Sequence, residues 1–74
     1  NIRVNALAPG YIMTDLNREF LQSEKGARLA KKVPMRRFAD IEELSAALIF
    51  LLDPQNSYMT GETLTIDGGM AAGL

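Results

Sequence analysis

The chain begins Asn1-Ile2-Arg3-Val4-Asn5-Ala6-Leu7, and the next three residues are Ala8-Pro9-Gly10. Branched apolar residues ahead of a proline–glycine pair are typical of a strand in a mostly buried sheet. Proline presets its own φ angle and pushes Ala8 toward extended geometry, while glycine accepts a positive φ. We therefore expect a strand over residues 2–7 and a type II turn at Pro9-Gly10 that takes the chain sharply out of the sheet.

A second strand is expected over residues 62–66. Leu64 and Ile66 fall on one face of this alternating run, and Asp67-Gly68-Gly69 ends it. Because Asp before Gly is ordinary turn chemistry, we interpret Asp67 as a turn residue and not as a catalytic one. With a helix between the two strands, the order suits a right-handed crossover between parallel strands and an α/β fold.

The clearest helix is expected over residues 40–52. Asp40 can cap its first N–H groups, Glu43 can complete a capping box, and Asp53-Pro54 ends the helix. One helical face carries Ile41, Leu44, Leu48, Leu51 and Leu52. The opposite side is also apolar, with Ala46, Ile49 and Phe50. Both sides need cover, so we expect one to pack on the sheet and the other to meet a second subunit or another segment.

The stretch from Thr14 to Lys32 predicts two short helices with a soft break. Gly26 has a low helix propensity and weakens this stretch. Val33-Pro34 ends it, and residues 35–38 link it to the following helix. We expect the whole region to be mobile.

A group of basic side chains lies in the same region, and its members are Arg28, Lys31, Lys32, Arg36 and Arg37. It could indicate an anionic substrate, a phosphorylated cofactor or nucleic acid. We favour a solvated helix face, because Glu19 and Glu24 lie nearby and the net charge of the chain is −1. Such a charge offers no global attraction to nucleic acid or to an anionic membrane.

The composition excludes several kinds of protein. With 47% hydrophobic and 23% charged residues, the chain does not resemble a disordered tail. It has no Cys and no His, so it lacks disulfides and the usual zinc and iron–sulfur ligands, and no metal site is expected. The longest apolar run, from Ala46 to Leu52, is far shorter than the roughly 18 residues that cross a bilayer. No signal peptide can be read, and a cytoplasmic location is the default expectation.

The length of the chain leaves a thin margin for independent folding. A unit of 74 residues buries a smaller fraction of its surface than a full-sized domain does, and two strands with one good helix do not close a core. The chain also opens on Asn1 rather than Met, directly into a strand. We therefore expect its first residue to lie in the middle of a longer protein, and the chain to be incomplete alone.

The residues after Leu7 carry the first functional signal. In open parallel sheets, ligands bind outside the carboxyl ends of the strands, so a cofactor would lie here. A turn that holds the following backbone away from the sheet leaves N–H and C=O groups free for an amide such as a nicotinamide carboxamide, and Thr14 adds a hydroxyl. The alternative is that Pro9-Gly10 only turns the chain and Thr14 only caps a helix.

Several separate motifs occur in order along the chain: Asn5-Ala6-Leu7-Ala8-Pro9-Gly10-Tyr11-Ile12-Met13-Thr14, Pro34-Met35-Arg36-Arg37-Phe38 with Glu42-Glu43-Leu44, Tyr58-Met59-Thr60-Gly61, and Asp67-Gly68-Gly69. Together they resemble the last part of classical short-chain dehydrogenases/reductases, over nearly the whole chain. The resemblance implies the C-terminal part of a Rossmann-type, doubly wound parallel sheet. Its parts would be a strand and nicotinamide-side turn at 1–14, a substrate-binding loop at 15–38, a helix at 40–52, and the last strand and turn at 62–69.

The resemblance also implies a set of binding residues. The cofactor is NAD or NADP, and its nicotinamide half would contact Pro9, Gly10, Ile12 and Thr14, with Ile12 pairing through its backbone. Side chains that would line the substrate pocket are Tyr11, Met13, Leu16 and Phe20. The 40–52 helix and the last strand would join subunits of a homo-oligomer, either a dimer or a tetramer.

The family's catalytic machinery is not matched by any residue of this chain. Its Gly-rich cofactor loop and its catalytic Ser, Tyr, Lys and Asn lie upstream of the matched region. Tyr11 and Tyr58 are followed four residues later by Asp15 and Glu62 rather than by the family's Lys, so we assign no catalytic residue.

Three functional hypotheses follow. In the first, the parent protein is an NAD(P)-dependent oxidoreductase that interconverts a small-molecule alcohol and a carbonyl by hydride transfer, and the 74 residues alone are inactive. In the second, they form a truncated, non-catalytic fragment that acts only as a binding or assembly module. The third and weakest is a nucleic-acid module with salt-sensitive binding. Neither the choice between NAD and NADP nor the identity of the substrate can be read from these residues.

Overall fold

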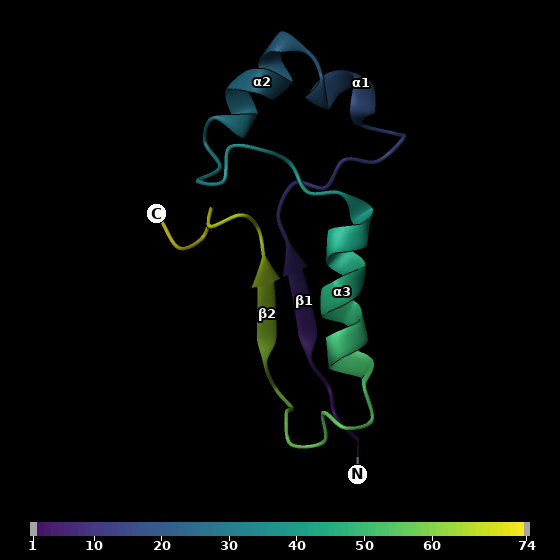
Figure 1. The fold of residues 1–74 in the computed structure, drawn as a ribbon. Coiled ribbons are helices and arrows are strands. Elements are labelled where there is room, and N and C mark those ends of the chain that lie inside the picture. Colours follow the sequence, from purple (N-terminus) through teal and green to yellow (C-terminus); the bar gives the residue numbers. More distant parts are fainter. Residues whose placement is uncertain (1, 74) are drawn as a thin grey trace.

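The computed structural model describes residues 2–73. The elements, in chain order, are β1 (Ala6–Pro9), α1 (Arg18–Leu21), α2 (Glu24–Ala30), α3 (Ile41–Leu52) and β2 (Thr63–Ile66). Figure 1 shows the two strands side by side with α3 lying along them, while α1 and α2 lie beyond the arrowheads of the strands. The predicted α/β class is therefore confirmed.

The two strands are parallel, as the sequence predicts. Their register pairs Ala6 with Thr63 and Pro9 with Ile66. Main-chain bonds of 2.8 Å run from Ala6 N–H to the carbonyl of Glu62 and from Gly10 N–H to that of Ile66. The carboxyl ends of β1 and β2 consequently lie at one edge of the sheet, beneath α1 and α2 (Figure 1).

The first strand lies later in the chain than the predicted span of residues 2–7. The N–H of Gly61 still donates to the carbonyl of Val4 at 2.8 Å, but the chain opposite bends at Gly61, where φ is 74°. Regular pairing therefore begins only at Ala6, opposite Thr63. It continues through Pro9 because successive N–H groups of a strand point to opposite sides. Those of Ala6 and Gly10 face β2, so the N–H that Pro9 lacks would have faced away, and the ladder loses no bond.

The predicted type II turn at Pro9-Gly10 is wrong. Gly10 is not among the glycines with positive φ, and the chain passes through it in line with the strand. Glycine is needed here for a different reason: a Cβ at this position would lie 2.8 Å from Cβ and 2.9 Å from Cα of Asp67. Gly10 therefore permits the close approach of two strand ends rather than a change of direction.

Helix α3 has the predicted start and end. Asp40 and Glu43 form a capping box, in which Glu43 Oε1 accepts the N–H of Asp40 at 3.0 Å, and Asp53 is the C-cap before Pro54. Its sheet-facing side is narrower than expected, because only Ala47 and Leu51 are buried. Ile49 and Phe50 keep 69% and 48% of their surface exposed, so the second apolar side of this helix has no cover among residues 2–73.

The region between β1 and α3 forms the two short helices that the sequence predicts. The break falls at Ser23, the N-cap of α2, whose Oγ accepts the N–H of Gly26 at 3.3 Å. Gly26 is not the break but a buried residue within α2. Helices α1 and α2 pack on each other and, within the described part of the chain, on no other helix or strand.

The core is small. Its buried apolar side chains are Leu21, Val33, Ala47 and Leu51. The longest helix, α3, has 12 residues, and no helix between residues 2 and 73 is both long and apolar enough to span a membrane.

Candidate functional site

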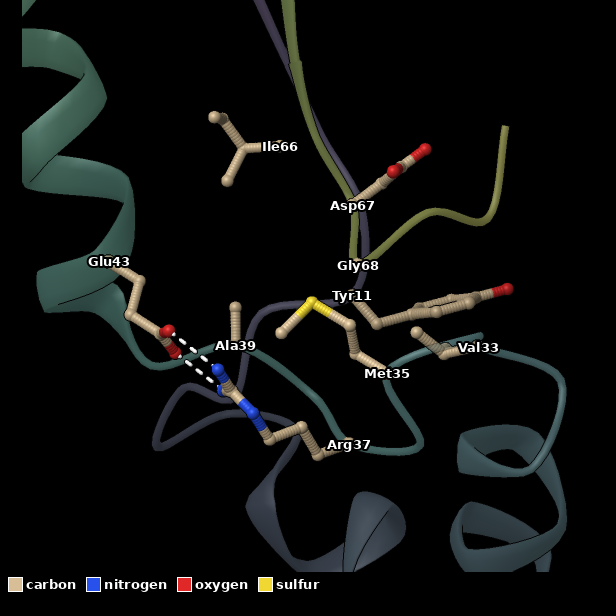
Figure 2. Close-up of a pocket in the computed structure, with 9 residues that line it drawn as sticks. All are labelled: Tyr11, Val33, Met35, Arg37, Ala39, Glu43, Ile66, Asp67 and Gly68. Carbon is tan, nitrogen blue, oxygen red and sulfur yellow. Dashed lines mark hydrogen bonds and ion pairs between the residues drawn. The ribbon is translucent and has the colours of Figure 1, made fainter. Parts of the chain in front are cut away.

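Three segments meet at the carboxyl edge of the sheet. Residues 11–14 follow β1, Asp67-Gly68 follows β2, and residues 33–39 cross between α2 and α3. They enclose a cavity of about 90 Å³. Its lining, drawn in Figure 2, consists of Tyr11, Val33, Met35, Arg37, Ala39, Glu43, Ile66, Asp67 and Gly68. This is the edge where an open parallel sheet binds its ligands.

Ile12 is held by a parallel bridge to Ala39. The carbonyl of Ala39 accepts the N–H of Met13 at 2.9 Å, and its N–H donates to the carbonyl of Tyr11 at 3.0 Å. Because Tyr11 and Met13 bond to Ala39, the N–H and C=O of Ile12 between them point away from Ala39. Its carbonyl accepts Asn17 Nδ2 at 2.9 Å, whereas no group in residues 2–73 accepts its N–H. A rigidly placed main-chain donor is therefore available at this edge.

Thr14 supplies a second available donor. Its N–H donates to Asn17 Oδ1 at 2.7 Å and its carbonyl accepts the N–H of Asn17 at 3.3 Å. Asn17, not Thr14, occupies the N-cap of α1. The side chain of Thr14 is exposed, and its hydroxyl makes no hydrogen bond within the described residues. The alternative reading of Thr14 as only a helix cap therefore does not match its position.

The donors of Ile12 and Thr14 fit the chemistry of a nicotinamide. A carboxamide offers a carbonyl oxygen that accepts from an N–H or a hydroxyl. Gly10 brings this segment against the Asp67 turn, and Pro9 ends β1 with its ring exposed. The four predicted cofactor residues thus form one continuous segment at the carboxyl edge of the sheet.

The four predicted substrate residues are separated by the structure. Tyr11 lines the cavity, is 44% exposed, and makes an edge-to-face contact with Phe38 at a centroid distance of 6.0 Å. Met13, Leu16 and Phe20 are not in the lining. Leu16 and Phe20 are 100% and 52% exposed, on the side of α1, so their apolar surface is open for a ligand or another segment.

An ion pair that the sequence did not predict forms part of the cavity lining. Figure 2 shows the guanidinium of Arg37 facing the carboxylate of Glu43, with both nitrogens 2.8 Å from an oxygen. The hydrogen bond from Arg37, and then that from the N–H of Asp40, lower the pKa of Glu43 to about 2. The same hydrogen bond raises the pKa of Arg37. The available signal was the Glu of the capping box, whose oxygens also face the chain that enters the helix.

The basic residues do not form one helix face. Arg28 is in α2, Lys31 is its C-cap, and Lys32, Arg36 and Arg37 lie in the segment that follows. All five are exposed, as expected for solvated charges. Arg37 differs from the predicted solvated helix face. Residues 31–39 leave the helix and pass beside the start of α3, where Arg37 pairs with Glu43.

Asp67 is a turn residue, as predicted. Its carboxylate accepts the N–H of Gly69 at 2.9 Å and that of Ala71 at 2.8 Å. The carbonyl of Gly68 accepts the N–H of Met35 at 3.1 Å, which ties the turn to residues 33–39. Both oxygens of Asp67 are thus committed to the backbone. Within residues 2–73 no three acidic side chains come together in a group that could hold a metal ion.

Comparison with known proteins gives consistent matches. The family model described as enoyl-(acyl carrier protein) reductase matches residues 1–71. Glucose 1-dehydrogenase 2 of Bacillus subtilis (strain 168) is 46% identical over 69 residues, which is 93% of this chain and 27% of that protein. The chain thus spans little more than a quarter of the length of this relative.

Solved structures agree with these sequence matches. A gluconate 5-dehydrogenase from Burkholderia cenocepacia J2315, in complex with NADP and tartrate, has a TM-score of 0.86 and 36% identity, over 100% of this chain and 29% of that one. A 4-hydroxyisoleucine dehydrogenase mutant complexed with NADH and succinate has a TM-score of 0.87 and 30% identity, over 99% of this chain and 30% of that one. The edge described above is therefore shared with structures that hold either dinucleotide.

Proposed function

Because the chain belongs to the short-chain dehydrogenase/reductase family, we propose that it forms the nicotinamide side of the cofactor site in an NAD(P)-dependent oxidoreductase. The reaction is the interconversion of an alcohol and a carbonyl by hydride transfer. The 74 residues would be the C-terminal part of such a Rossmann-type domain, and the catalytic groups would lie outside them.

The observation that carries this proposal is the unpaired N–H of Ile12. The bridge directs this main-chain donor away from Ala39, and no group in the described residues accepts it. A nicotinamide, when bound, supplies the carbon that accepts or donates the hydride. The chain's own residues bind and orient: Ile12 N–H and the Thr14 hydroxyl donate to the carboxamide, and Pro9 and Gly10 set their position at the strand end.

The substrate is proposed to be a small alcohol or carbonyl compound. The relatives include enzymes named for glucose and gluconate, and polyols and sugar acids of that kind would be the first compounds to test. Tyr11 faces the cavity, while Met13, Leu16 and Phe20 would line the substrate pocket from the loop at residues 15–38. Since Leu16 and Phe20 are exposed, closure of this loop over a substrate would cover their apolar surface.

The assembly is proposed to be a homo-oligomer, a dimer or a tetramer, joined through α3 and β2. The exposed apolar residues of α3, chiefly Ile49 and Leu52, support this arrangement. The alternative function, a non-catalytic binding or assembly module, is favoured by the same surface. The two functions differ in whether the protein binds a dinucleotide.

The test is a titration of the full-length protein that carries these residues with NADH and NADPH. Nicotinamide fluorescence reports the binding. We expect saturable binding of at least one of them. Replacing Thr14 by Val should weaken that binding about fivefold, the usual effect of losing about 1 kcal/mol of hydrogen bonding. Thr14→Ser keeps the hydroxyl and should bind normally.

The matched control is Thr63→Val, the same change at the amino end of β2, where the wild-type affinity should remain. If the protein binds neither dinucleotide yet associates with itself, the result would support the binding or assembly module and overturn the proposal of an oxidoreductase.

A further inference from the structure

The ion pair of Arg37 and Glu43 lies next to the proposed cofactor segment without belonging to it. We propose that Arg37 is a positioning residue, which holds residues 37–40 against α3 and thereby orients the free N–H of Ile12 toward the nicotinamide. This inference rests on the proposed function. It adds a residue that affects the cofactor contact of Ile12 indirectly, through Ala39.

The Arg37–Glu43 pair is bound at two points. Arg37 Nη1 and Nη2 each donate to a different oxygen of Glu43, at 2.8 Å in both cases. A planar guanidinium bound at two points has one orientation, unlike a lysine ammonium. Glu43 is in the first turn of α3, so the chain at residue 37 is fastened to the longest helix of the described residues.

Ala39 lies between the two backbone points that Glu43 restrains. Two residues before it, Arg37 binds Glu43, and one residue after it, the N–H of Asp40 donates to Glu43 Oε1 at 3.0 Å. One carboxylate thus restrains the chain on both sides of Ala39. We regard Ala39 as the residue through which Arg37 acts.

Ala39 is in turn bonded to the residues on both sides of Ile12. Ala39 binds the carbonyl of Tyr11 and the N–H of Met13, the two neighbours of Ile12. Any displacement of Ala39 therefore rotates the peptide between Tyr11 and Ile12, which carries the free N–H. The contact of Phe38 with the ring of Tyr11 adds a side-chain link between the same two segments.

The exposure of the pair indicates orientation rather than stability as its role. The side chains of Arg37 and Glu43 keep 49% and 40% of their surface exposed, and solvent-exposed ion pairs contribute little to folding. Loss of the pair should therefore leave the protein folded. It should remove a geometric constraint on a ligand contact, where small misplacements have large effects.

The test compares two ligands on the full-length protein that carries these residues. One is the preferred dinucleotide. The other, called the ribose ligand, is adenosine diphosphate ribose, which lacks the nicotinamide; if NADPH is preferred, its 2′-phosphorylated form is used. We expect Arg37→Ala to weaken dinucleotide binding about tenfold and to leave the affinity for the ribose ligand unchanged. Glu43→Gln, which keeps an acceptor for the N–H of Asp40, should behave in the same way.

Two further variants complete the experiment. Arg36→Ala is the matched control, because the neighbouring arginine forms no ion pair in the described chain, and both affinities should equal those of the wild type. Arg37→Lys keeps the charge without the two-point contact and should give a partial loss. It also serves if Arg37→Ala does not fold.

Equal losses for the two ligands, or none for either, would overturn the positioning role. A wild-type protein that binds the dinucleotide no better than the ribose ligand would instead overturn the proposed function. The two failures are thus distinguishable.

Discussion

The residue type required at some positions of this chain depends on distant neighbours as much as on local conformational preference. Gly10 and Gly26 both look like conformational choices in the sequence, one for a turn and one for a weak helix. In the structure both are required because another part of the backbone passes too close for a Cβ. Substitution by alanine separates these explanations.

Gly10→Ala should destabilise the protein by about 1–3 kcal/mol, the usual cost of overpacking. The added Cβ would meet the backbone of Asp67 at 2.9 Å, and neither strand end can move without losing the bond between Gly10 N–H and Ile66. Chemical denaturation measures the change. The contrast is Gly61→Ala, where nothing lies within 4 Å and only the strain of φ 74° applies. Wild-type stability in Gly10→Ala would contradict the close approach.

Gly26→Ala tests whether an alanine at this position stabilises or destabilises the protein. Helix propensity alone predicts a gain of about 1 kcal/mol for this change inside α2. The structure predicts a loss, because the Cβ would lie 2.1 Å from the carbonyl oxygen of Leu21 and must push α1 and α2 apart. Denaturation together with amide hydrogen exchange over residues 18–30 measures it. Lys25→Ala, an exposed change in the same helix, should have little effect, and a stabilised Gly26→Ala would contradict the packing.

At the scale of elements, the start of α3 combines a capping function with an ion pair in one side chain. Glu43 accepts from the backbone of Asp40 and from the guanidinium of Arg37. Negative charge near a helix N-terminus is also favourable. All three interactions are stronger when the carboxylate is ionised, so this element should respond to pH.

Glu43 has a pKa of about 2 in the folded protein, below its ordinary value of 4.5. Its stabilising contribution is therefore complete above pH 4.5 and is lost as the pH falls toward 2. We expect the difference in unfolding free energy between the wild type and Glu43→Gln to be constant from neutral pH to about 5 and to shrink below it. Denaturation across this pH range measures it, with Glu42→Gln as control. A difference that stays constant down to pH 2.5 would contradict the assignment.

At the scale of the whole molecule, the described fold is too open for an independent domain. Its radius of gyration is 14.5 Å, whereas a compact chain of this length has about 11 Å. Its accessible surface is 5823 Å², against roughly 4,500 Å² for a folded monomer of this size. The excess agrees with the uncovered apolar side of α3. Stable folding should need cover from other parts of the protein or from other copies.

We predict that a peptide of residues 1–74 alone is unfolded or strongly self-associated at low concentration. Circular dichroism and sedimentation velocity measure this. Ile49→Lys places a charge on the exposed side of α3 and should reduce the association. A cooperative melt of a monomeric peptide would contradict the prediction.

The sequence by itself determined the features whose signals lie within a few residues. The capping box of Asp40 and Glu43, the end of α3 at Asp53-Pro54 and the turn at Asp67 all appear in the structure as predicted. The parallel pairing also followed from the order of strand, helix and strand. These features are local because a helix cap or a turn is made by a side chain and the backbone next to it.

The tertiary structure alone decided the extent of β1, the reason for Gly10, the partner of Arg37 and the exposure of Leu16 and Phe20. Each depends on which segment lies opposite, and residues 10 and 67 meet only after the whole crossover has formed. Hydrophobic periodicity and turn propensity describe one segment at a time, so they carry no information about such an approach. The free N–H of Ile12 belongs to this second group, since only the bridge to Ala39 determines its direction.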